Sequence, residues 1–138
     1  MNTPLIPLAV VLVLSTVFPS RCPAREVKGV TFPETETIGS STVQLNGVGL
    51  RKKLVINVYL GALYLETHSS DAAQAIASDR PKRVILHFLY NNVGKDDLLN
   101  AWDEGFKNNN PAARLTALKD RIDTFKGFFT EPVKSGER

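Results

Sequence analysis

Residues 54–66 read LVINVYLGALYLE, the longest extended segment that the sequence predicts. β-Branched and aromatic residues dominate the segment, and both alternating sets of its side chains are largely apolar. A strand with two apolar faces is typical of a sheet that is covered on both sides. The segment therefore predicts a strand near the middle of a sheet, with other parts of the chain packed on each face.

Further strand patterns lie on both sides of this segment. A short strand is predicted over residues 26–32 and ends before Pro33. A second extended region covers residues 41–46 and 48–51, with a turn or bulge at Gly47. A buried strand is predicted over residues 83–90, which read RVILHFLY.

Helical patterns occupy the remainder of the chain. Residues 70–78 predict a short helix with Ser69 or Ser70 as N-cap and Asp71 in its first turn. Residues 95–107 predict a second helix, and its apolar face carries Leu98, Leu99, Trp102 and Phe106.

One more helix is predicted after residue 110. Asn110 and Pro111 are suited to its N-cap and its first position. A single continuous apolar stripe follows, made of Leu115, Leu118, Ile122, Phe125 and Phe129. The order of strands, helix, strand and two helices predicts an α+β domain with antiparallel pairing among the early strands.

The N-terminus has the pattern of a secretory leader. The run from Leu5 to Phe18 is apolar and uncharged, and it is too short for a spanning helix, which needs about 20 residues. We expect a signal peptide over residues 1–24, cleaved after Ala24, and one domain over residues 25–138. The alternatives are an uncleaved N-terminal anchor and a lipoprotein signal at Cys22. Cleavage would send the protein across the inner membrane, to the periplasm, without a stable membrane span.

Composition excludes several classes of function. Cys22 is the one cysteine, and it lies in the leader, so disulfides, thiol nucleophiles and thiolate metal sites are not expected in the mature chain. The net charge of +3 comes from charges of mixed sign, which is a poor indication of nucleic-acid binding. His68 and His87 form no HExxH motif, and no nucleotide-binding fingerprint is present. We expect no cofactor and no metal.

A basic cluster, Arg51, Lys52 and Lys53, comes just before the long strand. It fits a solvated hairpin end, which is the reading that spacing alone favours. A functional reading uses the strand that follows, where Asn57 and Tyr59 share a face with Gly61 and its missing side chain leaves room. A guanidinium near a tyrosine hydroxyl above an apolar sheet would bind a carboxylate or an enolate oxygen.

Several short motifs together resemble the chalcone isomerase-like family, and signal-bearing bacterial members most of all. They are Val27 to Pro33 (VKGVTFP), Leu45 to Lys53 (LNGVGLRKK), Val58 to Leu65 (VYLGALYL), and Asp97 to Phe106 (DLLNAWDEGF) preceded by the strand at Pro81-Lys82-Arg83. The resemblance runs from Val27 to about the final turn. It implies an open-faced β-sandwich in which helices cover one face of an antiparallel sheet, with a ligand cleft between them.

The resemblance also implies site residues. The family's Gly-x-Gly-x-Arg arginine is Arg51 here, and the family's threonine on the long strand falls at Tyr59. An arginine and a tyrosine hold the lipid carboxylate in fatty-acid-binding members. The catalytic tyrosine and asparagine of the plant enzymes fall at Asp97 and Glu104, and a carboxylate would repel a developing oxyanion. The family's last strands and helix have no counterpart in the sequence, so we expect a C-terminally incomplete, truncated domain.

These features predict three functions. The first is non-catalytic binding of a small amphipathic molecule such as a fatty acid, with Arg51, Tyr59, Asn57, Leu63, Trp102 and Phe106 as ligand-binding residues. The second is an isomerase or intramolecular lyase that acts on chalcone-like enones, with Arg51 as its catalytic residue. The third is a structural or interaction module with a vestigial cleft.

Overall fold

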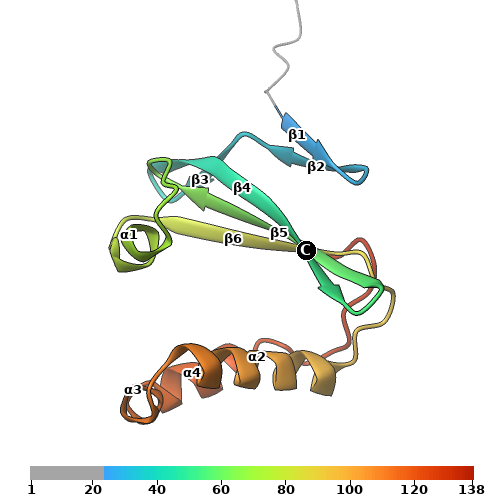
Figure 1. The fold of residues 1–138 in the computed structure, drawn as a ribbon, viewed down its shortest axis with the longest axis vertical. Coiled ribbons are helices and arrows are strands. Elements are labelled where there is room, and N and C mark those ends of the chain that lie inside the picture. The colour runs from blue at the N-terminus through green and yellow to red at the C-terminus, as the bar shows by residue number, and fades with distance from the viewer. Residues whose placement is uncertain (1–23) are drawn as a thin grey trace, which may run out of the picture.

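Residues 24–138 are described by the computed structural model of the protein, and all of the predicted leader except Ala24 lies outside them. Six strands and four helices make up this part of the chain (Figure 1). They are β1 (Ala24–Val27), β2 (Val30–Pro33), β3 (Thr35–Ile38), β4 (Ser41–Lys53), β5 (Ile56–Leu65), α1 (Ala72–Ala77), β6 (Lys82–Phe88), α2 (Lys95–Asn109), α3 (Ala112–Ala117) and α4 (Lys119–Lys126).

Four of the strands form one antiparallel sheet in the order β3-β4-β5-β6, and β1 and β2 form a separate antiparallel hairpin. The hairpin lies over one face of the sheet, while α2, α3 and α4 lie on the opposite side (Figure 1). The prediction of an α+β fold, with an antiparallel sheet and a layer of helices, is confirmed.

The hydrophobic core lies on the side of the sheet that faces the β1–β2 hairpin. Tyr64 is fully buried there, and its hydroxyl donates a hydrogen bond of 3.0 Å to the carbonyl of Pro33. The bond satisfies a polar group that would be costly to bury unpaired. The buried members of the core come from β2, β4 and β5, and they are Phe32, Val43, Leu45, Leu60, Ala62 and Tyr64.

The sheet curls around this core. Glu36 on β3 and Arg83 on β6 belong to opposite edge strands, yet their side chains form an ion pair of 3.1 Å. Antiparallel sheets twist and coil by nature, and bulges increase the effect. Pairing across the open side of the curl therefore closes the core at this end.

Two irregularities in the β4–β5 ladder shape the sheet. The pairing passes from Leu45–Tyr64 directly to Gly47–Leu63, which leaves Asn46 as an extra residue and confirms the predicted bulge. The Asn46 side chain is turned toward Ser69, with which it exchanges two hydrogen bonds of 2.9 and 3.0 Å. The bulge therefore fastens the loop that leads to α1.

The first predicted strand is in fact a hairpin. Lys28 and Gly29 both have positive φ, 50° and 76°, and they join β1 to β2 through the Val27–Val30 pair. Positive φ at both central residues is the geometry of a tight hairpin turn, and glycine adopts it freely. The prediction of one extended segment over residues 26–32 was therefore wrong.

The central strand is shorter than predicted. It begins at Ile56, because Lys53 pairs with Ile56 and leaves Leu54 and Val55 as a two-residue turn. Both turn residues are almost fully exposed, so the expectation of cover on both sides fails at this end. β6 also ends two residues early, at Phe88.

The helices follow the predictions with three corrections. The N-cap of α1 is Asp71, whose carboxylate accepts hydrogen bonds from the amides of Ala73 and Gln74. Pro111 is the N-cap of α3, so it precedes the first helical residue. The expected continuous helix is divided at Leu118, where ψ is 2°. The helix predicted over residues 95–107 is confirmed as α2.

The last described residues fold back toward β6. Val133 pairs with Val93 in an isolated bridge, and Phe88 exchanges backbone hydrogen bonds with Gly136 and Glu137. Arg138 donates to the carbonyl of Thr31 at 3.0 Å and to Nδ1 of His87 at 3.4 Å. The polar segment at residues 131–138 therefore connects β6 with β2.

Candidate functional site

Arg51 and Tyr59 form a direct cross-strand pair near the end of the β4–β5 ladder. The guanidinium carbon of Arg51 lies over the Tyr59 ring, 5.8 Å from its centre. A cation above an aromatic face at this distance is attracted by the ring, which holds the guanidinium in place without consuming its N–H donors. The pair therefore presents a cation and a phenol side by side.

Both groups are available to a ligand. Among the residues that the structure describes, Arg51 forms no ion pair, and neither its guanidinium nor the Tyr59 hydroxyl hydrogen-bonds to another protein group. A guanidinium offers planar paired donors that match a carboxylate, and a phenol offers one more. The arrangement suits an anion with two oxygens.

A small hollow of about 120 Å³ opens beside this pair, between the sheet and the first half of α2. The strands contribute Arg51, Lys53, Val58, Tyr59 and Phe88, and the other side contributes Val93, Asp97, Leu98, Ala101 and Trp102. The hollow therefore has a basic rim on the sheet side, and its helix side is apolar apart from Asp97.

A larger apolar groove of about 730 Å³ continues from it between β6 and the helices. Phe88 and Trp102 line both spaces, so the two are neighbours that share a wall. The volume lies in the range of about 300–1,000 Å³ that is typical of small-molecule sites. Its lining includes the apolar residues Val84, Leu86, Phe125 and Phe129 and the charged residues Glu36, Arg83 and Arg138.

Aromatic contacts hold the helical wall of this groove together. Trp102 packs edge-on against Phe125 at 5.4 Å between ring centres and also contacts Phe129 at 5.7 Å. On the sheet side, Tyr59 packs against Phe88 at 5.5 Å. Such pairs rigidify an apolar surface, so the groove is expected to be largely formed before any ligand enters.

The family of the chain follows from comparison with known proteins. A family model described as chalcone isomerase-like matches residues 24–138, the same residues that the structure describes. The chain belongs to the chalcone isomerase-like family. Searches among curated proteins and among solved structures found no match. The fold and the family predicted from the sequence are therefore confirmed.

The chalcone isomerase-like chain brings three of the predicted site residues together, since Arg51, Tyr59 and Trp102 all line the small hollow. Leu63 does not line either space and is half-buried between Gly47 and Val84 in the ladder. Phe106 lies farther along α2, where its ring packs on Phe125 at 5.9 Å. Its contribution is to the helical wall.

Asn57 does not line the hollow either. The second irregularity of the β4–β5 ladder falls between the pairs Arg51–Tyr59 and Lys52–Asn57, so Val58 is an extra residue there and strict alternation of the two faces is broken. The Val58 carbonyl instead accepts hydrogen bonds from the amides of Leu89 and Tyr90. The expectation of a shared face for Asn57 and Tyr59 did not allow for this bulge.

Two buried polar atoms of the described chain have no hydrogen-bond partner, Oδ1 of Asn57 and Nε1 of Trp102. An unpaired buried donor costs about 1–3 kcal/mol. Trp102 lines both spaces, so an unpaired indole N–H belongs to a residue of the shared wall.

The two acidic positions at which the family resemblance places catalytic residues differ in location. Asp97 lines the small hollow with Arg51, whereas Glu104 is exposed on α2 and lines neither space. Within residues 24–138 no group of three or more His, Cys, Asp or Glu side chains is arranged to hold a metal ion. No helix in that range is long and apolar enough to cross a membrane.

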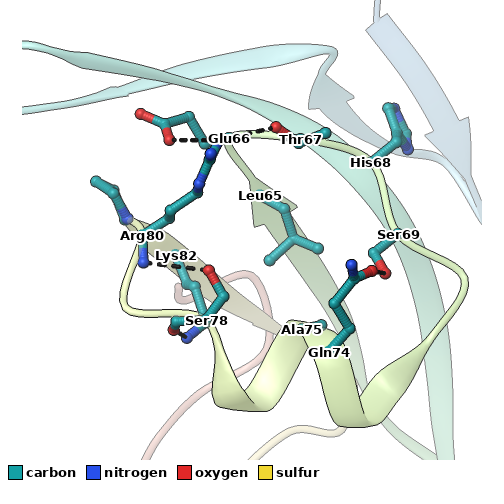
Figure 2. A pocket seen from close by; sticks show the side chains of 11 residues that line it. Leu65, Glu66, Thr67, His68, Ser69, Gln74, Ala75, Ser78, Arg80 and Lys82 are labelled. Carbon is teal, nitrogen blue, oxygen red and sulfur yellow. Dashed lines mark hydrogen bonds and ion pairs between the residues drawn. The ribbon is translucent and has the colours of Figure 1, made fainter.

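A separate polar hollow of about 250 Å³ lies at the other end of the sheet, between α1, the loop after β5 and the start of β6 (Figure 2). Its cations are already engaged. Arg80 contacts Glu66 at 3.5 Å and Thr67 at 3.3 Å, and the ammonium of Lys82 donates to the carbonyls of Ser78 and Ile76. The unpaired Arg51 therefore marks the other hollow as the better candidate for anion binding.

Sequence reasoning missed the site residues that come from β6, from α4 and from the segment just after α4. The sequence predicts a buried strand that contains Phe88 and a helical stripe that contains Phe125 and Phe129. Neither pattern links these residues to the cleft. An apolar stripe is equally typical of ordinary core packing. The signal that remains in the sequence is that the last two stripe positions, Phe125 and Phe129, are both aromatic.

Proposed function

We propose that the protein binds a small amphipathic carboxylate, such as a fatty acid, without chemical change, and does so in the cell envelope after loss of its leader. The observation that carries the proposal is the free Arg51–Tyr59 pair at the basic rim of an apolar cleft. The guanidinium and phenol would hold the carboxylate. The acyl chain would pass Phe88 and Trp102 into the larger groove.

The charge pattern supports binding over catalysis. Asp97 lines the hollow in which an enolate or phenolate oxygen would have to develop its negative charge. A carboxylate there opposes the charge instead of stabilising it, and stabilisation of that charge is commonly the largest contribution to such reactions. A bound carboxylate needs only a net attraction, which Arg51 and Lys53 supply on the facing side.

An isomerase or intramolecular lyase that acts on enones is the second candidate, and the position of Arg51 in the cleft favours it. It predicts that chalcone cyclises faster with the protein than with its Arg51→Ala variant. Equal rates for the two proteins would exclude this candidate and leave the binding proposal unaffected.

The binding proposal is testable through Trp102, the single tryptophan of the chain. We expect a fatty acid brominated along its acyl chain to quench Trp102 fluorescence saturably, and the unbrominated acid to reverse the quenching by competition. Native mass spectrometry of the purified protein should show a bound lipid. Absence of both quenching and bound lipid would overturn the proposal.

A further inference from the structure

The turn between β4 and β5 is the most exposed apolar feature of the described chain. Leu54 and Val55 are each 93% exposed, and Ile56 beside them is 41% exposed. Scattered exposed apolar residues are normal on protein surfaces. Two neighbouring aliphatic side chains at the tip of a projecting hairpin are a different case, since nothing in the fold shields them.

The backbone at this turn is also unfavourable for the residues that occupy it. Leu54 has φ of 54°, a left-handed conformation that glycine, asparagine or aspartate adopts with less strain. Glycine, asparagine or aspartate would therefore suit the turn better, both in backbone conformation and in exposure to water. An apolar pair in such a position points to a role outside the folded chain.

Basic residues directly precede the tip. Arg51, Lys52 and Lys53 are all exposed, and within residues 24–138 none of them is paired with a carboxylate. The tip therefore combines apolar side chains that project beyond the sheet with cations just behind them. A bilayer interface with anionic lipids complements both features, because the apolar side chains can insert among acyl chains and the cations are attracted by the anionic head groups.

The size of the feature favours a lipid surface over a protein partner. A stable protein–protein interface buries about 1,200–2,000 Å² in total and involves some 20–30 residues on each side. The tip offers two aliphatic side chains and three cations, far fewer groups than such an interface needs. A membrane requires no surface of matching shape, so a small apolar tip with adjacent basic residues is sufficient.

We propose that the β4–β5 turn, Leu54 and Val55 with the adjacent Arg51, Lys52 and Lys53, docks on the interface of a bilayer that contains anionic lipids. The inference stands independently of the proposed ligand. Because Arg51 and Lys53 also line the small hollow, docking by this turn brings the basic rim of the cleft close to the membrane.

A fluorophore at the tip tests the proposal in the full-length chain. The single cysteine is replaced (Cys22→Ser), and an environment-sensitive NBD group is attached after Val55→Cys. A matched protein carries the label after Ile76→Cys in α1, a site 80% exposed at the opposite end of the sheet (Figure 1). A local label separates contact at the tip from attachment through the leader.

We expect the tip label to shift to the blue with vesicles of phosphatidylethanolamine and phosphatidylglycerol, and to be quenched by brominated lipid. The label in α1 should show neither effect, and pure phosphatidylcholine vesicles should give a weaker response. Lys52→Gln and Lys53→Gln should each raise, by about fivefold at low salt, the lipid concentration that gives half of the maximal blue shift. Leu54→Gly, which relieves the positive φ, should weaken the response several-fold.

Three results would overturn the proposal. The first is a tip label that stays in water although the protein sediments with vesicles. The second is an equal fluorescence response of the tip label and the α1 label. The third is a tip label whose fluorescence responds to protein concentration in the absence of vesicles. The last result would show that a second copy of the chain covers the turn.

Discussion

Arg51 and Tyr59 lie directly opposite each other in the β4–β5 ladder, with the guanidinium carbon 5.8 Å from the centre of the tyrosine ring. A bulge at Val58 follows at once, so this is the last regular pair before the ladder changes register. The pair also borders the cleft that runs under β6 along α2. Sheet geometry therefore decides where the cation and the phenol are presented.

Asp97 sets the charge of the hollow from the helix side. Asp97→Asn removes a negative charge that faces the proposed carboxylate, so we predict affinity for fatty acids that is about two- to fivefold higher, the equivalent of about 0.5–1 kcal/mol. Isothermal titration at low salt measures the change.

Asp96→Asn is the matched control for this prediction. Asp96 and Asp97 share the first turn of α2, so both substitutions lose a similar interaction with the helix dipole. Asp96 does not line the hollow. Equal affinity changes in the two variants would place the effect in the helix and not in the cleft.

His87 predicts a loss of stability in mild acid. Burial, aided by the neighbouring Arg138, lowers the pKa of His87 below its ordinary value of 6.5. The unfolded chain then binds a proton more readily than the folded one, so the free energy of unfolding is full above about pH 6.5 and falls as the pH drops below it, by at most about 1.4 kcal/mol per pH unit. Urea denaturation across this pH range measures the slope.

Two histidine variants assign that slope. His87→Gln should flatten the pH dependence in this window, whereas His68→Gln should leave it unchanged, because His68 is exposed. A slope that survives His87→Gln, or disappears in His68→Gln, contradicts the assignment.

The Glu36–Arg83 ion pair predicts a modest contribution to the curl of the sheet. The side chains are 24% and 44% exposed, so solvent screens the pair and its coupling should be about 0.2–1 kcal/mol. A double-mutant cycle with Glu36→Gln and Arg83→Gln, followed by chemical denaturation, measures it. Coupling near zero at low salt would mean that the core holds the two edges together without this pair.

Much of the fold was open to prediction because the local signals agree with the tertiary structure. The apolar face of α2 and the bulge beside Gly47 follow from periodicity and from a glycine within an extended segment. The prediction of the fold failed where a residue adopts a conformation that its type disfavours. Leu54 and Val55 continue the apolar pattern of the strand, and valine favours strands, yet the two residues form the turn because ladder register overrides the local pattern.

The candidate site was predictable on one side only. Arg51 and Tyr59 belong to a local hairpin, so sequence spacing brings them together. Trp102, Phe88 and Phe125 meet through contacts between α2, β6 and α4, which periodicity does not specify. The break at Leu118, which divides the apolar stripe between α3 and α4, left no signal in the stripe itself.

Comparison of a fatty acid with the fatty alcohol of the same chain length tests the central claim most directly. We predict that the protein prefers the carboxylate by about tenfold or more, since hydrogen bonds to a charged group contribute about 1.5–3 kcal/mol. Arg51→Gln should remove most of this preference and leave alcohol affinity unchanged, while Arg114→Gln on α3 should have no effect. Equal preference in the Arg51→Gln and unsubstituted proteins would contradict the assignment of Arg51 as the carboxylate anchor.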